Sequence, residues 1–558
     1  MEYYAKSKKV QFTSERINEI KKNLKNIEEC LKENLTETDV EILNSSITDI
    51  AEKTEEKQKT LKEHHKDIVT CAEMFFLEYG EYFTEKEKKL VVEACRIHDL
   101  GKVNLVFQAM ICPELAEKFH IDVRKTPQIP HGFLSAVTIS LDEFDDLSEL
   151  FSDKDFGPFI TAVYYHHDRE DHYNSLAIRK YAEKYYMKQI EEYLNRKIRK
   201  LNCSNLDDLL FRNNVYTGKY IPDSNAWKEY LLIKGLLNKF DYTVSAGYEN
   251  AESAVDLHEK KLVKNIEKFL NGKELRPAQK FMKMNRDKNL IVIAPTGSGK
   301  TEASLLWMNG EKSFYTLPLK VSSNAIYLRI KENYEYKDVA LLHSDAMAVY
   351  LREYNGNEDI GEKYERSKML SQPLTVCTVD QLFRFVYRAL GTEIFAATLK
   401  YSKLVLDEIQ AYEPRVIATI IYGLKMIQEM GGKFAIITAT FPPVLKYFME
   451  QYGLFEGKQY IFKDFTGKEY QVEKYPRHKV EIRHSEMNLD EIRLRGKNRK
   501  VLVICNTVSK AQKLYKKLEG ETVWLLHSKY IRRDRAFLER KIMEFSESGE
   551  SGIWITTQ

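Results

Sequence analysis

The sequence predicts a multidomain fold in which an all-α N-terminal half is followed by α/β lobes built on parallel sheets. The chain has 558 residues, more than one hydrophobic core usually serves, so about three domains of roughly 100–200 residues are expected. Up to about residue 250, Leu and Ile recur at helical spacing among Lys and Glu. From about residue 270, short apolar runs alternate with helical stretches, which is typical of parallel strands covered by helices.

The expected domains follow these changes in composition. A helical extension over residues 1–55 precedes an all-α domain over 56–250. The first α/β lobe covers 251–445, a connector covers 446–495, and a second lobe starts at 496–558. About 60 residues are too few for a doubly wound sheet, so we expect an incomplete second lobe and a C-terminal truncation. The expected strands are residues 290–294, 313–317, 374–378, 404–407 and 434–438, then 500–506, 522–526 and 553–557.

Composition excludes several classes of protein. The 86 basic and 83 acidic residues leave a net charge of only +3, so nucleic acid would be bound through local basic patches. The seven cysteines never form a CxxC pair, which argues against a disulfide framework and a zinc ribbon. No signal peptide and no apolar stretch of about 20 residues is present, so we expect a cytoplasmic protein without membrane contact.

Histidines concentrate in the all-α half, where eight of the 13 lie within the first 172 residues. Imidazole and carboxylate ligands suit divalent transition metals. In a helical His-Asp pair the carboxylate can bridge two ions, and two ions about 3.5–4 Å apart clamp a phosphodiester. We therefore expect a site for two ions, drawn from Mn, Co, Ni, Fe or Mg. The candidate ligands are His64 (or its neighbour His65), His98, Asp99, His131, His166, His167 and Asp241.

Lys102 lies one helical turn after His98 and is placed to balance charge on a scissile phosphate, so we assign it a catalytic role. A lone histidine is more often a core or surface residue, and we interpret His120 and His172 in that way. The whole constellation is much rarer than an isolated His-Asp pair. It resembles the HD superfamily over about residues 60–245, and the spacing of Leu61, His64 and Asp67 favours His64 over His65.

The first α/β lobe carries a nucleotide-binding pattern. Ala294-Pro295-Thr296-Gly297-Ser298-Gly299-Lys300-Thr301 supplies a loop and a helix N-terminus for phosphates, with Lys300 for the β/γ charge and Thr301 for Mg²⁺. An apolar run then delivers Asp407 to the magnesium shell and Glu408 to the attacking water. We expect ATP with Mg²⁺, bound by Gln279, Thr296, Gly297, Ser298, Gly299, Lys300, Thr301, Asp407 and Glu408.

Further motifs resemble those of superfamily 2 helicases with RecA-like lobes. Gln279 stands where helicases place an adenine-reading glutamine, Thr378–Gln381 resembles a strand-gripping loop, and Thr438-Ala439-Thr440 resembles the motif that couples ATP to strand movement. With the HD pattern ahead of them, and with Val379–Phe383 and Asp407–Tyr412, the chain resembles the type I CRISPR-associated helicase–nucleases.

That resemblance implies an HD-type metal-dependent nuclease domain followed by RecA-like lobes. It also implies ATP-driven 3′→5′ travel on single-stranded DNA, recruitment by a Cascade-type surveillance complex, and antiviral defence in a prokaryote by a monomer. Cleavage could be endonucleolytic or exonucleolytic. Gln410 stands where this family more often carries histidine, and it can still bond Thr438 or Thr440. Because the arginines that reach the γ-phosphate would lie downstream, we expect weak or no DNA-stimulated ATPase activity from this chain alone, while its metal-dependent nuclease activity is kept.

Residues 173–200 interleave tyrosines with Lys and Arg, which suits either a single-strand path or, somewhat better, an amphipathic helix with its tyrosines inward. Two other functions stay open at this point. One is an HD-type nucleotide phosphohydrolase regulated by the helicase-like part. The other is an inactive relic that docks on a partner complex.

Overall fold

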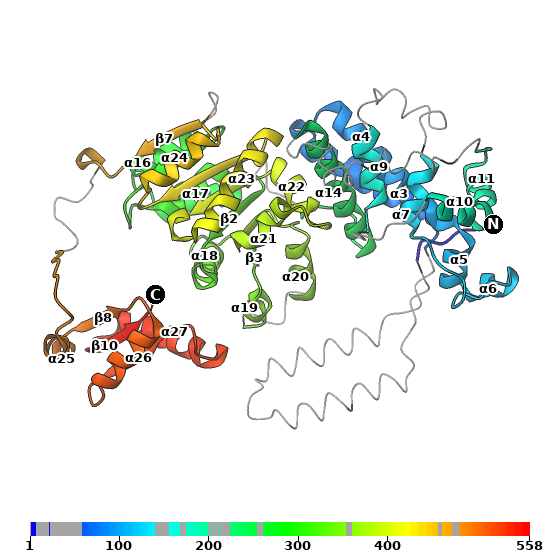
Figure 1. Cartoon of the computed structure of the whole chain (residues 1–558). Helices are drawn as coiled ribbons and strands as arrows, with labels where there is room; N and C mark the ends of the chain where they lie inside the picture. The colour runs from blue at the N-terminus through cyan, green and yellow to red at the C-terminus, as the bar shows by residue number, and fades with distance from the viewer. Residues whose placement is uncertain are drawn as a thin grey trace. The chain divides into compact units, whose positions relative to one another are not determined.

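The computed structural model describes residues 2–6, 22, 59–139, 156–167, 175–198, 201, 210, 224–253, 260–352, 360–455, 460–470 and 479–557. These divide into two compact units, Met1–Gln471 and Val472–Gln558 (Figure 1). Across these described ranges, no helix has the length and apolar character that a bilayer crossing requires.

The N-terminal half of the first unit is helical, as predicted. Capping boxes start two of its helices: Thr60 with Glu63 before α3, and Thr84 with Glu87 before α4. The described helices are α3 (Leu61–Tyr79), α4 (Glu85–Ile97), α5 (Leu105–Ile111), α6 (Pro113–Lys118), α7 (His131–Thr138), α9 (Phe156–Tyr164), α10 (Ser175–Tyr185), α11 (Met187–Leu194) and α14 (Asn225–Ser245), with 3₁₀ turns η1 (Gly80–Tyr82) and η2 (Leu100–Val103).

Helix α14 is the centre of this domain. It is buried on nearly all sides, and it packs on α3, α4 and α9 within the domain and on α22 (Glu393–Lys400) of the α/β lobe. A Cβ on Gly235 would lie 2.5 Å from the carbonyl oxygen of Glu393, so glycine permits the close crossing of α14 and α22. The buried charge of Lys234 beside this crossing is paired, because its Nζ lies 2.8 Å from a carboxylate oxygen of the equally buried Glu393.

The α/β lobe of the same unit contains a seven-stranded parallel sheet in the order β3-β4-β2-β5-β6-β1-β7. All five predicted strands are present. The strands are β1 (Asn289–Ile293), β2 (Ser313–Leu317), β3 (Val339–Leu342), β4 (Leu374–Thr378), β5 (Lys403–Asp407), β6 (Lys433–Thr438) and β7 (Tyr460–Asp464). The helices are α15 (Lys261–Leu270), α16 (Pro277–Met284), α17 (Lys300–Met308), α18 (Lys320–Glu332), α19 (Ala346–Arg352), α20 (Ile360–Lys368), α21 (Val379–Leu382), α22, α23 (Pro414–Met430) and α24 (Pro443–Gln451).

Sequence analysis missed the two edge strands, β3 and β7. β3 has only four residues, and β7 combines three apolar residues with Lys463 and Asp464 and is at most partly buried, so neither gives a strong apolar signal. β7 lies within the range that we assigned to the connector, yet it pairs in parallel with β1 from Asn289↔Tyr460 to Ile293↔Asp464. This part of the connector therefore completes the first sheet.

The second unit has a parallel sheet in the order β8-β10-β9, formed by β8 (Lys500–Ile504), β9 (Val523–Leu526) and β10 (Gly552–Thr556). Its helices are α25 (Leu489–Asn498), α26 (Val508–Lys517) and α27 (Arg532–Glu547). The three predicted strands are thus present. An all-α domain followed by RecA-like α/β lobes is the predicted fold class.

Most of the predicted helical extension, residues 1–55, lies outside the described residues. Its described start, residues 2–6, is not helical, and Tyr4 forms an antiparallel bridge with Thr60. Tyr3 and Ala5 are buried in the core of the all-α domain. This segment therefore belongs to the domain that we expected it only to precede.

Candidate metal centre and nucleotide site

The backbone around Asp99 brings two distant segments into contact. Helix α4 ends at Ile97, and His98 and Asp99 lead into η2. A Cβ on Gly101 would lie 2.0 Å from the carbonyl oxygen of His131, so only glycine allows this approach to the start of α7. Ser135 fixes it, since its Oγ accepts a hydrogen bond from the Gly101 amide at 2.7 Å and donates one to the His131 carbonyl at 2.9 Å.

The fully buried Asp99 carboxylate faces a different pair of imidazoles with each oxygen. Its Oδ2 lies 3.4 Å from Nε2 of both His64 and His98. Its Oδ1 lies 3.2 Å from His131 Nε2 and 3.6 Å from His166 Nε2. Asp99 is thus shared by two groups whose ligand atoms lie within 4.8 Å of one another: His64, His98 and Asp99, and Asp99, His131, His166 and His167.

The remaining predicted ligands extend these groups. Asp241, on α14, has its Oδ1 3.3 Å from His64 Nε2. His167 Nε2 lies 2.6 Å from His131 Nε2, a contact that two neutral imidazole lone pairs would not make without a proton or a cation between them. The structure therefore gathers the other six predicted ligands around the Asp99 carboxylate.

Neighbouring carbonyls fix the orientation of two imidazoles. His98 Nδ1 lies 3.0 Å from the Cys95 carbonyl oxygen, and His166 Nδ1 lies 2.7 Å from that of Val163. A ring whose Nδ1–H donates to a carbonyl presents the lone pair of Nε2, as metal-binding histidines do. Both Nε2 atoms and Asp99 Oδ1 are buried and lack a hydrogen-bond partner among the described residues.

The electrostatics of the cluster suit cation binding. Burial would raise the pKa of Asp99, but His98 and Lys102 hold it well below its ordinary value, so the carboxylate is ionised. Burial lowers the pKa of His131 to about 3 and also lowers the pKa of His166, so both imidazoles are neutral near pH 7. The ionised Asp99 carboxylate, the neutral imidazoles of His131 and His166 and the buried ligand atoms without hydrogen-bond partners together fit divalent cations.

The other candidates of this half lie differently. Lys102 is nearly buried, and its Nζ lies 2.6 Å from Asp99 Oδ2, so it contacts the carboxylate rather than projecting into an open site. His65 Nδ1 lies 3.2 Å from the Tyr193 hydroxyl, and His65 belongs to neither ligand group, although its ring lies beside that of His98. His120 is exposed, and His172 lies outside the described residues.

The predicted nucleotide residues gather at the carboxyl ends of β1 and β5. Gly297 and Gly299 have positive φ values of 75° and 82°, which shape the loop before Lys300 begins α17. The Lys300 ammonium pairs with the Glu408 carboxylate. Thr301 is buried, whereas Thr296 is exposed and Ser298 half-buried. Gln279 lies beside the loop, with Nε2 3.4 Å from the Gly299 carbonyl oxygen.

The two acidic residues after β5 differ in environment. Burial raises the pKa of Asp407 to about 6, although its Oδ2 accepts a hydrogen bond from the Tyr315 hydroxyl at 2.7 Å. Glu408 adopts a left-handed conformation with φ 55°. Gln410 donates to Glu408 and accepts from the Thr438 hydroxyl, so the expected bond between Gln410 and Thr438 is present. It links the acidic pair to the loop after β6.

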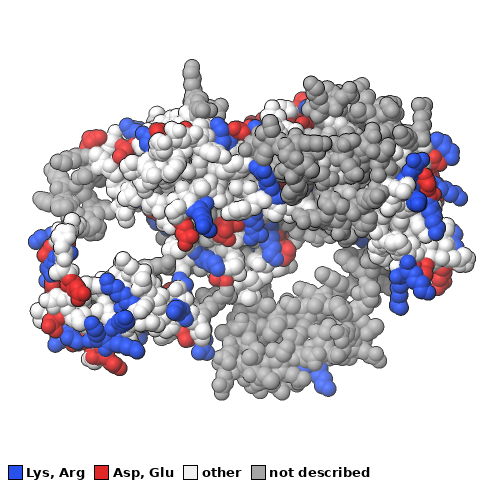
Figure 2. Space-filling model, viewed as in Figure 1, with Lys and Arg blue, Asp and Glu red and all other residues white. Residues whose placement is uncertain are grey.

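The basic and aromatic stretch forms α10 and α11. Tyr181 and Tyr186 are buried, whereas Lys184, Lys188 and Lys197 are exposed. Figure 2 shows basic side chains interspersed with acidic ones where these helices lie. Tyr173, Arg199 and Lys200 lie outside the described residues. The described part matches the amphipathic interpretation better than a continuous DNA path.

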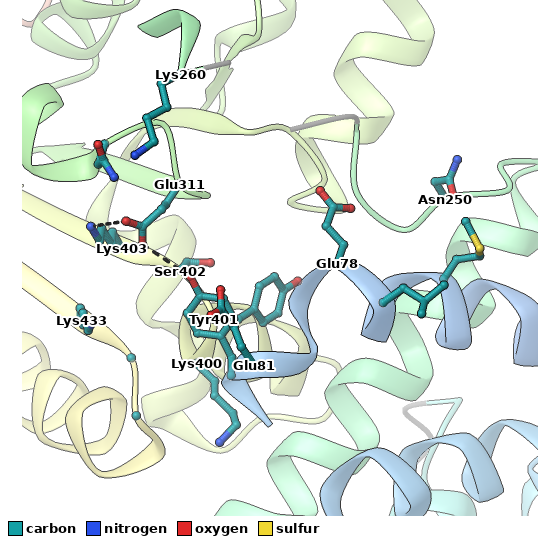
Figure 3. A pocket seen from close by; sticks show the side chains of 16 residues that line it. Glu78, Glu81, Asn250, Lys260, Glu311, Lys400, Tyr401, Ser402, Lys403 and Lys433 are labelled. Atoms are coloured by element: carbon teal, nitrogen blue, oxygen red, sulfur yellow. Dashed lines mark hydrogen bonds and ion pairs between the residues drawn. The ribbon is translucent and has the colours of Figure 1, made fainter. Parts of the chain in front are cut away.

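A cavity of about 1030 Å³ lies where the all-α domain meets the α/β lobe, apart from both predicted sites. Figure 3 shows Glu311 between Lys403 and the end of α3. Lys403 Nζ lies 2.7 Å from a Glu311 carboxylate oxygen, and the Tyr82 hydroxyl lies 3.5 Å from the other. The charge pair lies within the α/β lobe, and the Tyr82 hydroxyl connects it to the all-α domain.

Three family models match the sequence in succession. "Cas3, HD domain" matches residues 51–220, "DEAD/DEAH box helicase" matches 277–448, and "CRISPR-associated nuclease/helicase Cas3, C-terminal" matches 497–558. The chain belongs to the Cas3 family. The family assignment makes it a hydrolase with a nuclease-type HD domain and a helicase-type ATPase domain.

Individual relatives agree. The "CRISPR-associated nuclease/helicase Cas3" of Methanothermobacter thermautotrophicus is 25% identical over 582 residues, which cover 91% of this chain and 68% of that protein. The crystal structure of T. fusca Cas3 with AMPPNP has a TM-score of 0.61 at 18% identity, covering 90% of this chain and 68% of the other. A structure entitled "CRISPR RNA-guided surveillance complex, pre-nicking" contains a protein that matches with a TM-score of 0.51 at 17% identity and 90% and 66% coverage. The structural matches show the shared fold.

Proposed function

We propose that this chain is an ATP-dependent helicase on single-stranded DNA and a metal-dependent DNA nuclease. It degrades invading DNA in the prokaryotic cytoplasm after recruitment by a Cascade-type surveillance complex. The observation that carries the nuclease part is the buried Asp99 carboxylate, which faces His64 and His98 with one oxygen and His131 and His166 with the other. A carboxylate shared in this way suits two divalent ions on one phosphodiester.

In the HD domain, the protein's own residues hold and orient the reacting groups. His64, His98 and Asp241 would bind one ion and His131, His166 and His167 the other, with Asp99 between them. When bound, the ions supply a water with a lowered pKa and neutralise charge on the phosphodiester. The carbonyls of Cys95 and Val163 keep two imidazoles in the ligating tautomer. Lys102 holds the Asp99 carboxylate in place.

In the ATPase domain, Lys300 pairs with Glu408 in the structure and would exchange that partner for the β- and γ-phosphates of ATP. Glu408 can then accept a proton from the attacking water. The hydrogen bond from Gln410 holds the Glu408 carboxylate in position. Thr301 and Asp407 would complete the Mg²⁺ shell. Gln410 also accepts a hydrogen bond from Thr438, the last residue of β6. A change in the nucleotide bound at this site would therefore be transmitted to the loop that follows β6.

The proposed partners rest on the relatives. The Methanothermobacter protein is named a CRISPR-associated nuclease/helicase, and the structure that contains a matching protein is entitled a CRISPR RNA-guided surveillance complex before nicking. An HD domain attached to an ATPase lobe suits a protein that moves a strand past its nuclease site. We propose that the protein acts as a monomer on DNA that such a complex has opened.

The nuclease proposal is tested with circular single-stranded DNA and Mn²⁺, Co²⁺, Ni²⁺, Fe²⁺ or Mg²⁺. We expect cleavage by the wild-type protein and none by Asp99→Ala. Lys300→Ala is the matched control, because it disables the ATP site in the same protein and should cut the circle as the wild type does when ATP is absent. Hydrolysis of nucleotides without cleavage of DNA would refute the proposal and indicate a phosphohydrolase.

A further inference from the structure

The first described residues of the protein form part of the wall of the HD domain. The Ala5 amide donates to the Lys59 carbonyl at 3.0 Å, and the Leu61 amide donates to the Tyr3 carbonyl at 2.8 Å. The buried side chain of Gln108 binds both backbone groups of Tyr4, accepting from its amide at 3.0 Å and donating to its carbonyl at 2.9 Å. The backbone of residues 3–5 is therefore held by residues 59 and 61 on one side and by Gln108 on the other. These bonds also fix the position from which Lys6 extends.

That next residue, Lys6, extends toward the end of α14 that carries the predicted metal ligand Asp241. Lys6 Nζ donates to the Ser245 carbonyl oxygen at 3.1 Å. The Ser245 hydroxyl in turn donates to Asp241 Oδ1 at 3.0 Å. A single residue, Ser245, thus connects the Lys6 ammonium by hydrogen bonds to the predicted metal ligand Asp241.

The charges around Lys6 are those of the metal centre. Burial lowers the pKa of Lys6 below its ordinary value, the Asp241 and Asp99 carboxylates oppose that lowering, and the Lys102 ammonium adds to it. Lys6 is only partly buried, whereas Lys102 is nearly fully buried and already contacts Asp99. Of these two lysines, Lys6 is the less buried.

We propose that Lys6 binds a phosphate group of the nucleic-acid strand at the HD metal centre, as a substrate-binding residue supplied by the N-terminal segment. This inference rests on the proposed nuclease function. A lysine ammonium is a compact cation with three donors, so it can donate to the Ser245 carbonyl and to a phosphate oxygen at the same time. Its position beside Asp241 sets the strand on the side of the centre formed by α14 and α3.

The alternative role for Lys6 is structural. Ser245 is the last residue of α14, and a lysine near a helix C-terminus stabilises the helix dipole. The two roles predict different measurements. A helix cap affects the thermal midpoint and does not affect the salt dependence of DNA binding, whereas each phosphate contact adds about 0.7 to the slope of log K against log salt for a single strand.

The test uses the whole protein, Mn²⁺ and a short fluorescent single-stranded oligonucleotide without ATP, so that only the HD domain acts. Lys6→Met should lower kcat/KM for cleavage about 10- to 100-fold, mainly through KM, and reduce the salt slope by about 0.7. Lys6→Arg should keep most of the activity. Calorimetric titration with Mn²⁺ should give the wild-type stoichiometry and affinity for both variants.

Lys66→Met is the matched control, because it removes the same charge from an exposed position on α3. It should leave kcat/KM and the salt slope unchanged. Wild-type kcat/KM and salt slope in Lys6→Met would overturn the inference, and so would a loss of Mn²⁺ binding in that variant, which would place Lys6 in support of the metals. A wild-type protein that cuts DNA with none of the metals would instead refute the proposed function, and the inference with it.

Discussion

Gly101→Ala is the substitution that most directly tests how the metal centre is assembled. The added Cβ would lie 2.0 Å from the His131 carbonyl oxygen and 2.7 Å from the His131 carbonyl carbon. Both atoms belong to backbone, so the clash is not relieved by rotation of a flexible side group. Bringing the closer contact from 2.0 Å to an ordinary 3.4 Å separates the two backbones by about 1.4 Å.

That displacement is large for metal binding, where ligand distances hold to about 0.2 Å. His98 and Asp99 precede Gly101 on one segment, whereas His131 lies on the segment that would be pushed away. We therefore expect the ion bound by His131, His166 and His167 to be lost first, with its affinity lowered about 100-fold. The group of His64, His98 and Asp241 does not cross the Gly101 contact and should keep its ion.

The assay is calorimetric titration with Mn²⁺ together with cleavage of single-stranded DNA. The wild type should bind two equivalents and Gly101→Ala one, with cleavage about 100-fold slower because a 1 Å misplacement has roughly that effect. Gly80→Ala is the matched control: Gly80 has φ −59°, and its added Cβ would meet only the flexible end of Lys88 at 3.2 Å. Two equivalents at wild-type affinity in Gly101→Ala would refute the reasoning.

Three other contacts lead to predictions of their own. Ser135→Ala leaves the buried Gly101 amide without its acceptor, so urea denaturation should show about 1–3 kcal/mol less stability and Mn²⁺ titration a weaker second equivalent. Because burial raises the pKa of Asp407 to about 6, protons compete with Mg²⁺ for its carboxylate below that pH. Mg²⁺-dependent binding of a fluorescent ATP analogue should therefore weaken about tenfold for each pH unit below 6. In Asp407→Asn, this binding should not depend on pH. Glu393→Gln leaves Lys234 buried without a carboxylate, and urea denaturation should show a loss of about 3–5 kcal/mol; an unchanged midpoint would contradict the role of this ion pair.

The fold class and the chemistry of both sites could be predicted from local sequence. Apolar runs such as Ser313–Leu317 and Leu374–Thr378 are buried strands wherever they occur in an α/β pattern, so the pattern was enough to predict them. The seven candidate ligands are histidines and aspartates gathered in the all-α half, and imidazole together with carboxylate suits divalent transition metals. For that reason they could be predicted before their geometry was known.

How these parts meet depends on long-range packing. The sharing of Asp99 between two imidazole pairs depends on the close approach of Gly101 to His131, two positions 30 residues apart whose contact no local pattern encodes. β7 joined the first sheet because β1 offered an unpaired edge, although its own residues give a weak strand signal. Lys6 contacts Ser245, next to the metal centre, because Gln108, about a hundred residues away, binds the backbone before it. Local periodicity identifies what a residue can do, whereas the tertiary contacts determine which residues do it together.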